Sequence, residues 1–188
     1  MQIIPAILTN DVEEFNNLLA SISHKYDRVQ IDFVDNEYAK NQTILPNIVK
    51  NPYGLKLDAH LMVAEKNLQN YLNNLVGFDR IIVQMESISN PEDFDCLALD
   101  IHSPIESIKP YLAKLKLVNL MSIEPGIGGQ KLDPRIFEII SNLSNLRRLN
   151  NLSFLISVDG GIEREHLEKL ESLGVDEVVV GAKRVLLW

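Results

Sequence analysis

The chain has 188 residues, of which 46% are hydrophobic and 23% charged, and its formal net charge is -8. This composition is that of an ordinary globular protein, which excludes intrinsic disorder, and the length predicts one domain over residues 1–188. The acidic balance argues against a surface for nucleic acid or for an anionic membrane, so we expect a small-molecule partner. The single cysteine, Cys96, cannot form an internal disulfide. The opening residues lack the features of a signal peptide, and no apolar run approaches about 20 residues, so we expect a cytoplasmic protein.

Eight short segments rich in Ile, Val and Leu recur along the chain and predict eight strands. They are nearly continuous hydrophobic runs, which is typical of parallel strands covered on both faces. In chain order they are QIIPAIL (2–8), RVQIDF (28–33), LKLDAHLM (55–62), RIIVQM (80–85), DCLALDI (95–101), LVNLMSI (117–123), FLISVDGG (154–161) and EVVVGA (177–182).

Four amphipathic segments between these strands predict helices: residues 10–25, 64–77, 133–149 and 164–174. Asn10 or Asp11 is the expected N-cap of the first, Asp133 caps the third with Pro134 as its first helical residue, and Gly174 ends the fourth. The alternation of strands and helices predicts a (β/α)8 TIM barrel.

Two connections are short for this fold. Only ESISNPEDF (86–94) joins the fourth and fifth strands, and only KRVLLW (183–188) follows the eighth. A parallel connection usually needs about a dozen residues, so we expect a compact barrel with its fourth and eighth helices shortened or missing. An open doubly wound sheet is the alternative fold.

Polar residues gather where the predicted strands end, which is where barrels of this kind place their active sites. Asp32 and Asp159 lie near the ends of the second and seventh strands, so they could give and take a proton from opposite walls. The full set is Gln30, Asp32, Asp35, Asp58, His60, Gln84, Glu86, Asp100, His102 and Asp159. Glycine loops follow the last three strands, in EPGIGGQ, DGGI and at Gly181, and backbone N–H groups in such loops bind phosphate.

Five of these segments together resemble the ribulose-phosphate 3-epimerase family of (β/α)8 barrels. They are IIPAIL, VQIDFVDN, LDAHLMV, LMSIEPGIGGQ and SVDGGI, and the likeness runs from the first strand to the eighth. The resemblance implies a metal-assisted interconversion of D-ribulose 5-phosphate and D-xylulose 5-phosphate, two small phosphosugars, by proton transfer at C3. It implies that Asp32 and Asp159 are the catalytic acid and base on opposite faces of the substrate.

The resemblance also implies a ligand set and a substrate site. A divalent cation (zinc, iron or manganese) would be held by Asp32, His60 and Asp159, with Gln30 at the fourth ligand position. Substrate-binding positions follow from the same motifs: Met62, Met121, Gly126, Gly128, Gly129, Gly160, Gly161, Gly181 and Ala182.

Five positions depart from the family pattern. Gln30 and Gln84 stand where histidines are usual, Ala6 and Ala182 where serines are usual, and Val34 where methionine is usual. Gln30 replaces an imidazole ligand by a weaker neutral donor, so metal affinity is expected to fall.

Three functional hypotheses therefore remain open: an active epimerase with an altered metal shell, a catalytically impaired relative that binds a phosphorylated ligand or a partner chain, and an epimerase of another ketose phosphate such as a hexulose 6-phosphate. The apolar end VLLW (185–188) further suggests a homo-oligomer, in which a second copy covers this flank.

Overall fold

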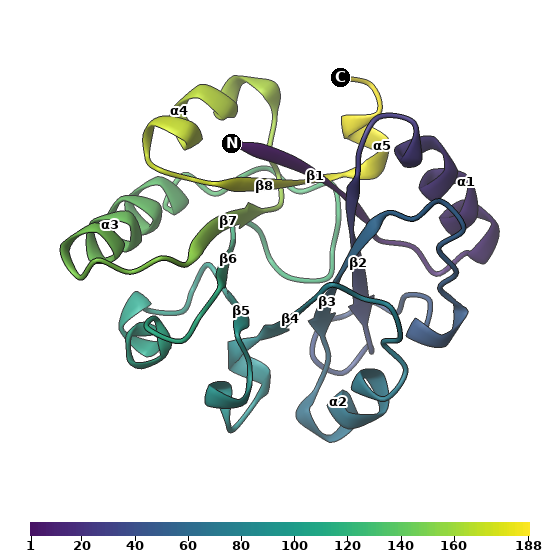
Figure 1. Cartoon of the computed structure of the whole chain (residues 1–188), viewed down its shortest axis with the longest axis horizontal. Helices are drawn as coiled ribbons and strands as arrows, with labels where there is room; N and C mark the ends of the chain where they lie inside the picture. The colour runs from purple at the N-terminus through teal and green to yellow at the C-terminus, as the bar shows by residue number, and fades with distance from the viewer.

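The computed structural model describes residues 1–188, and its eight strands form one closed, all-parallel barrel in sequence order. Figure 1 shows the strands as a central ring with the helices outside it, and β1 beside β8 where the ring closes. The predicted barrel is thereby confirmed, and the open sheet is excluded. None of the helices is long and apolar enough to cross a membrane.

The strands coincide closely with the eight predicted segments. They are β1 (Gln2–Ile7), β2 (Arg28–Val34), β3 (Lys56–Met62), β4 (Arg80–Gln84), β5 (Cys96–Leu99), β6 (Leu117–Met121), β7 (Leu155–Asp159) and β8 (Glu177–Gly181). The α-helices are α1 (Val12–Ser23), α2 (Glu65–Leu72), α3 (Ile136–Leu149), α4 (Leu167–Ser172) and α5 (Ala182–Val185).

Helix starts follow local hydrogen bonding. Asp11 is the N-cap of α1, as predicted, because its carboxylate accepts from the N–H groups of Glu13 and Glu14. Helix α3 begins at Ile136, later than the expected start at Pro134, since the chain first makes a tighter turn in which the Ile136 N–H donates to the Asp133 carbonyl. Gly174 follows the end of α4 with φ +89°, which fits its expected role at the helix end.

Three of the crossover connections contain no α-helix. The fourth has only two 3-10 turns, Met85–Ser87 and Pro91–Asp93, and the eighth helix has four residues, so both expected reductions are confirmed. The second and fifth connections are also reduced to 3-10 turns, at Pro46–Ile48, Ile105–Ser107 and Lys109–Tyr111, which the sequence analysis did not predict. The outer layer of helices is therefore thin around β3 to β6 (Figure 1).

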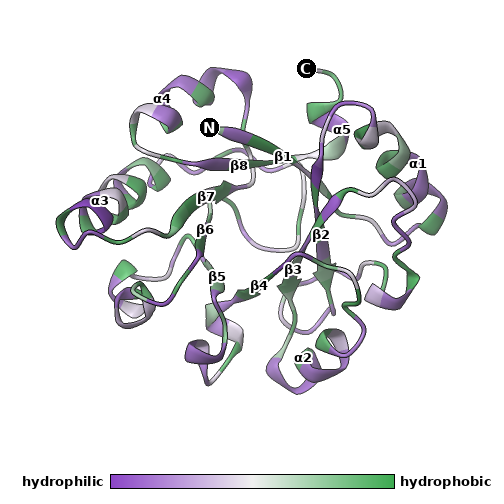
Figure 2. Cartoon of the chain, viewed as in Figure 1, coloured by the Kyte–Doolittle hydropathy of each residue, from purple (hydrophilic) through white to green (hydrophobic).

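Most of the apolar core lies between the strands and the surrounding helices, in clusters of 20 and 18 buried residues. In Figure 2 the hydrophobic colour runs along β6 and β7, whereas the outward sides of α2, α3 and α4 are largely hydrophilic. Two smaller apolar clusters, which include Ile4, Val179, Ile82 and the buried Cys96, lie in the barrel interior. Polar side chains occupy both ends of that interior.

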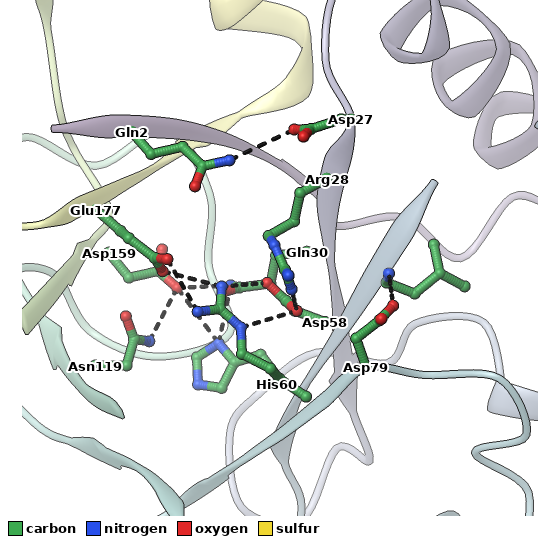
Figure 3. A network of polar contacts seen from close by, with 12 residues as sticks. Gln2, Asp27, Arg28, Gln30, Asp58, His60, Asp79, Asn119, Asp159 and Glu177 are labelled. Carbon is green, nitrogen blue, oxygen red and sulfur yellow. Dashed lines mark hydrogen bonds and ion pairs between the residues drawn. The ribbon is translucent and has the colours of Figure 1, made fainter. Parts of the chain in front are cut away.

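The end that carries the strand N-termini holds a buried ion network, shown in Figure 3. Arg80 donates to both oxygens of Asp58, at 3.0 and 2.5 Å, and to Glu177 at 3.0 Å. Arg28 also bonds to Asp58, which is fully buried. Asp58 therefore belongs to this network, and the expectation that it lies with the polar residues at the opposite end is wrong.

Candidate active site

Three ionisable side chains from separate strands meet at the other end of the barrel. Asp32 on β2, His60 on β3 and Asp159 on β7 are all buried, with exposed fractions of 8%, 0% and 7%. The His60 Nδ1 atom lies 3.4 Å from Asp32 Oδ1 and 3.4 Å from Asp159 Oδ2. In-register pairing explains part of this geometry, because Asp32 pairs directly with His60 across β2 and β3.

Gln30 lies beside these three side chains, two residues before Asp32 on the same face of β2, and is 1% exposed. Its amide nitrogen donates to Asp32 Oδ1 at 2.8 Å and to Asp159 Oδ2 at 2.7 Å (Figure 3). The same nitrogen lies 3.3 Å from His60 Nδ1. The amide therefore bridges the two carboxylates to which the family resemblance gives the catalytic roles.

The electrostatics of the cluster favour an extra proton. Burial raises the pKa of Asp32, and the charge of Asp159 raises it further, against the opposing hydrogen bonds from His60 and Gln30. Burial alone would lower the pKa of His60, but its contacts with Asp159 and Asp32 raise it to about 9. The cluster therefore holds a proton more strongly than the same side chains would in water.

A cavity of about 570 Å³ opens above this cluster. Asp32, His60 and Asp159 form part of its wall, together with all nine predicted substrate-binding positions: Met62, Met121, Gly126, Gly128, Gly129, Gly160, Gly161, Gly181 and Ala182. Ala6 lines it too. Its volume lies in the range of small-molecule sites.

The donor types match those of a divalent cation site. One ligand atom from each of Asp32, His60 and Asp159 lies within 4.8 Å of the others, and carboxylate oxygens with an imidazole suit a borderline or hard cation. These three side chains could therefore hold a metal ion. Gln30, the expected fourth ligand, does not present a ligand atom to this site. Its N–H₂ group, which is a hydrogen-bond donor, points toward the two carboxylates.

Two further features of the site were not singled out from the sequence. Asn119 on β6 is fully buried, and its amide nitrogen lies 3.3 Å from Asp159 Oδ2. The signal was present, because Leu117, Asn119 and Met121 alternate on one face of β6. Lys183 lines the cavity directly after Ala182 and pairs with Glu14 of α1 at 2.5 Å.

A closed (β/α)8 barrel with two buried carboxylates and several glycines around one cavity at the carboxyl ends of its strands is the arrangement typical of barrel enzymes. The family follows from sequence comparison. Residues 2–185 match the profile of the "Ribulose-phosphate 3 epimerase family", and the chain belongs to that family. It is an enzyme of the isomerase kind, within the epimerases.

Curated relatives agree with this placement. The ribulose-phosphate 3-epimerase of Helicobacter pylori strain J99 is 30% identical over 97% of this chain and 89% of its own length. Those of Bacillus subtilis and Schizosaccharomyces pombe are 28% and 29% identical, and the alignments cover 97% and 96% of this chain and 91% and 85% of theirs.

Solved structures support the fold alone. The tryptophan synthase complex of Pyrococcus furiosus matches with a TM-score of 0.60 at 16% identity, over 96% of this chain and 87% of that one. Phosphoribosyl anthranilate isomerase of Thermus thermophilus matches with a TM-score of 0.59 at 13% identity, over 99% and 95%.

Proposed function

We propose that this enzyme interconverts D-ribulose 5-phosphate and D-xylulose 5-phosphate by moving a proton at C3. The observation that carries the proposal is the pairing of Asp32 and Asp159. They come from strands on different walls, line one cavity and accept hydrogen bonds from the same amide nitrogen. The family and its curated relatives support the substrate.

The two carboxyl groups divide the work in this proposal. The ionised one removes the C3 proton, and the electron pair of the C–H bond moves into a C2–C3 double bond while the carbonyl oxygen at C2 takes the negative charge. The neutral one then delivers its proton to the opposite face of C3, and the C2 carbonyl re-forms. The enzyme ends with the proton on the other carboxyl group, so the reverse reaction starts from that state.

The glycine loops bind the phosphate in this scheme. Gly160 and Gly161 follow β7, Gly181 is the last residue of β8, and Ala182 begins α5 directly after it. The loops after the seventh and eighth strands bind phosphate in many barrels. Backbone N–H groups serve there because no side chain limits the approach of the anion. Lys183 adds a positive charge at the same rim.

Asp32, His60 and Asp159 would hold a divalent cation of the zinc, iron or manganese type. When bound, such a cation supplies Lewis-acid stabilisation of the negative oxygen that develops at C2. The residues of the chain still carry out the proton transfers.

The test is an assay of purified protein with D-ribulose 5-phosphate, with and without added manganese, iron(II) or zinc, beside Asp32→Asn and Asp159→Asn. Each variant should lose about 10²–10⁴-fold in kcat, since each lacks one acid/base group. In deuterated water each should still exchange the C3 proton of one epimer only, the one whose proton faces the remaining carboxylate. Asp100→Asn, at the end of β5 and outside the cavity wall, is the control and should keep its activity.

Other outcomes identify the alternatives. Turnover of a hexulose 6-phosphate in place of the pentulose phosphate would assign a different ketose phosphate to the same chemistry. A folded protein with neither turnover nor C3 exchange, with any of the metals, would make the chain a phosphate-binding or partner-binding relative that is catalytically impaired.

A further inference from the structure

Gln30 uses both of its amide hydrogens on the two carboxylates. Its nitrogen donates to Asp32 Oδ1 at 2.8 Å and to Asp159 Oδ2 at 2.7 Å. A primary amide nitrogen carries two hydrogens, so none is left for His60 Nδ1 at 3.3 Å. With an exposed fraction of 1%, the side chain has no water to replace these bonds. The contact is therefore a saturated bridge between the two catalytic groups.

The bridge involves the atoms that a cation would need. Asp32 Oδ1 and Asp159 Oδ2 are also the oxygens nearest to His60 Nδ1, at 3.4 Å each, so these three atoms would converge on a metal ion. The lone pair of an amide nitrogen is delocalised into the carbonyl and does not ligate metals, so only Oε1 of Gln30 could serve as a ligand.

The two orientations of the amide thus belong to two different states. With the nitrogen inward, Gln30 holds the carboxylates together by hydrogen bonds. With the oxygen inward and no cation, three acceptor oxygens would face one another at about hydrogen-bond distance, which costs free energy in a buried site. To become a ligand, Gln30 must turn its amide around and give up both hydrogen bonds.

We infer that Gln30 is a positioning residue that holds Asp32 and Asp159 in place without a cation, and that it competes with a divalent cation for the same two oxygens. The catalytic meaning of this inference rests on the proposed function, whereas the competition for the cation does not. Because the Gln30 amide is a neutral donor, it can hold Asp32 and Asp159 in the same geometry whether or not a metal ion is available.

Removal of the side chain separates this role from that of a ligand. If Gln30 were a metal ligand, Gln30→Ala would bind a cation more weakly than the wild type. If Gln30 competes, the same variant frees both oxygens and binds the cation more tightly. We expect the Kd for manganese to fall about tenfold in Gln30→Ala, because one hydrogen bond to a charged group corresponds to roughly that factor.

The experiment is a calorimetric titration of metal-stripped protein with manganese chloride, for wild type, Gln30→Ala and Gln30→His. Gln30→His should bind more tightly still, since it adds an imidazole ligand. Gln84→Ala is the matched control. Gln84 is a fully buried amide that contacts His60 at 3.2 Å through the other ring nitrogen and does not touch either carboxylate. Its removal frees no carboxylate oxygen and takes away a partner of a ligating histidine, so Gln84→Ala should not bind manganese more tightly than the wild type.

Thermal unfolding gives a second readout that needs no activity. Manganese should raise the Tm least in the wild type, more in Gln30→Ala and most in Gln30→His, because a ligand that binds only the folded state stabilises it in proportion to its affinity. Weaker manganese binding by Gln30→Ala than by the wild type, or a larger rise in Tm with manganese in the wild type than in that variant, would overturn the inference. Absence of epimerase activity with the expected affinities would overturn only the proposed function.

Discussion

At the scale of single residues, Asp35 shows how one carboxylate organises the rim of the site. Its Oδ1 accepts from the N–H groups of Glu37 and Tyr38, and its Oδ2 accepts from the Ala64 N–H and the Asn67 amide, so it ties the loop after β2 to the start of α2. Burial alone would raise the pKa of Asp35, but these four hydrogen bonds outweigh it and lower the pKa.

We therefore expect Asp35→Asn to lower the free energy of unfolding at pH 7 by about 1 kcal/mol, discounted for the partial exposure of the group. An amide offers one acceptor oxygen, so one of the two pairs of donors loses its partner. Because the folded pKa lies below the unfolded one, the contribution is complete above about pH 4 and disappears as the pH falls through the folded pKa. Urea unfolding between pH 2.5 and 7 measures this, with exposed Glu92→Gln as the control. A deficit that stayed constant with pH would contradict it.

The sequence could predict which residues meet in the site but not how they bond. Asp32, His60 and Asp159 were predictable because a barrel brings the ends of all its strands to one face. That the Gln30 nitrogen would bridge two carboxylates was not, since a strand pattern gives the side of the sheet and not the rotation of an amide. Asp58 was misplaced for a related reason: period-two alternation puts Asp58 and His60 on one face, yet they lie at different depths of the barrel.

At the scale of elements, the strands and the four longer helices were predictable from their hydrophobic patterns and caps, whereas the missing helices of the second and fifth connections were not. The segment after β2 contains polar and turn-forming residues that are compatible with several loops, and the Ile105–Tyr111 region has apolar residues at spacings that also suit a short helix. Whether these segments form a helix or 3-10 turns depends on how they pack against the barrel, and a local sequence pattern does not contain that information.

The loop after β7 is held by a close approach of two backbones. Gly161 has φ +64°, and a Cβ there would lie 2.3 Å from the Leu132 nitrogen in the segment that follows the β6 loop. Gly77 has a similar positive φ of +82° but nothing within 4 Å of its Cβ position. A comparison of alanine substitutions at the two glycines therefore separates the stability cost of the left-handed backbone from the cost of the steric clash.

Gly77→Ala should cost about 1–2 kcal/mol of stability through its left-handed backbone alone. Gly161→Ala should cost more than this, because the methyl group also pushes apart two backbone segments, and it should raise the KM for the phosphorylated substrate. Paired thermal melts and steady-state assays of both variants check the prediction. Equal losses of stability in the two variants would show that the close approach at Gly161 has no energetic consequence.

At the scale of the whole molecule, the buried ion network at the strand N-termini contributes to the closure of the barrel. Asp58 on β3 contacts Arg28 on β2 and Arg80 on β4, and Arg80 reaches Glu177 on β8. Two cations and two anions therefore balance across four strands in a region where Asp58 has no exposed surface.

Asp58→Asn should lower the free energy of unfolding by about 3–5 kcal/mol, because it leaves buried guanidinium groups without a full counter-charge. Chemical denaturation measures the loss. The control is Asp95→Asn, which removes an exposed pair with Lys116 and should leave stability nearly unchanged. A small effect of Asp58→Asn would mean that water reaches the network.

The homo-oligomer suggested by the apolar C-terminal residues remains a prediction. Val185 is fully buried. The Arg164 guanidinium carbon lies 5.7 Å from the centre of the Trp188 ring and covers it. Only Leu187, which is 86% exposed, offers a large free apolar surface there. Light scattering at micromolar concentration decides between a second copy on this flank and a stable monomer.

The pairing of β1 with β8, from Gln2 with Glu177 to Ala6 with Gly181, joins the first strand to the last, so the barrel cannot close until β8 has been synthesised. Asp32 and Asp159 lie on strands that are separated, on one side of the ring, by this pair alone. Until β8 has been synthesised, β1 and β7 have unpaired edges that can recruit other chains. Asp32 and Asp159 therefore reach their final relation only when β8 pairs with both neighbours, and a barrel that has not closed presents two edges at which it can aggregate.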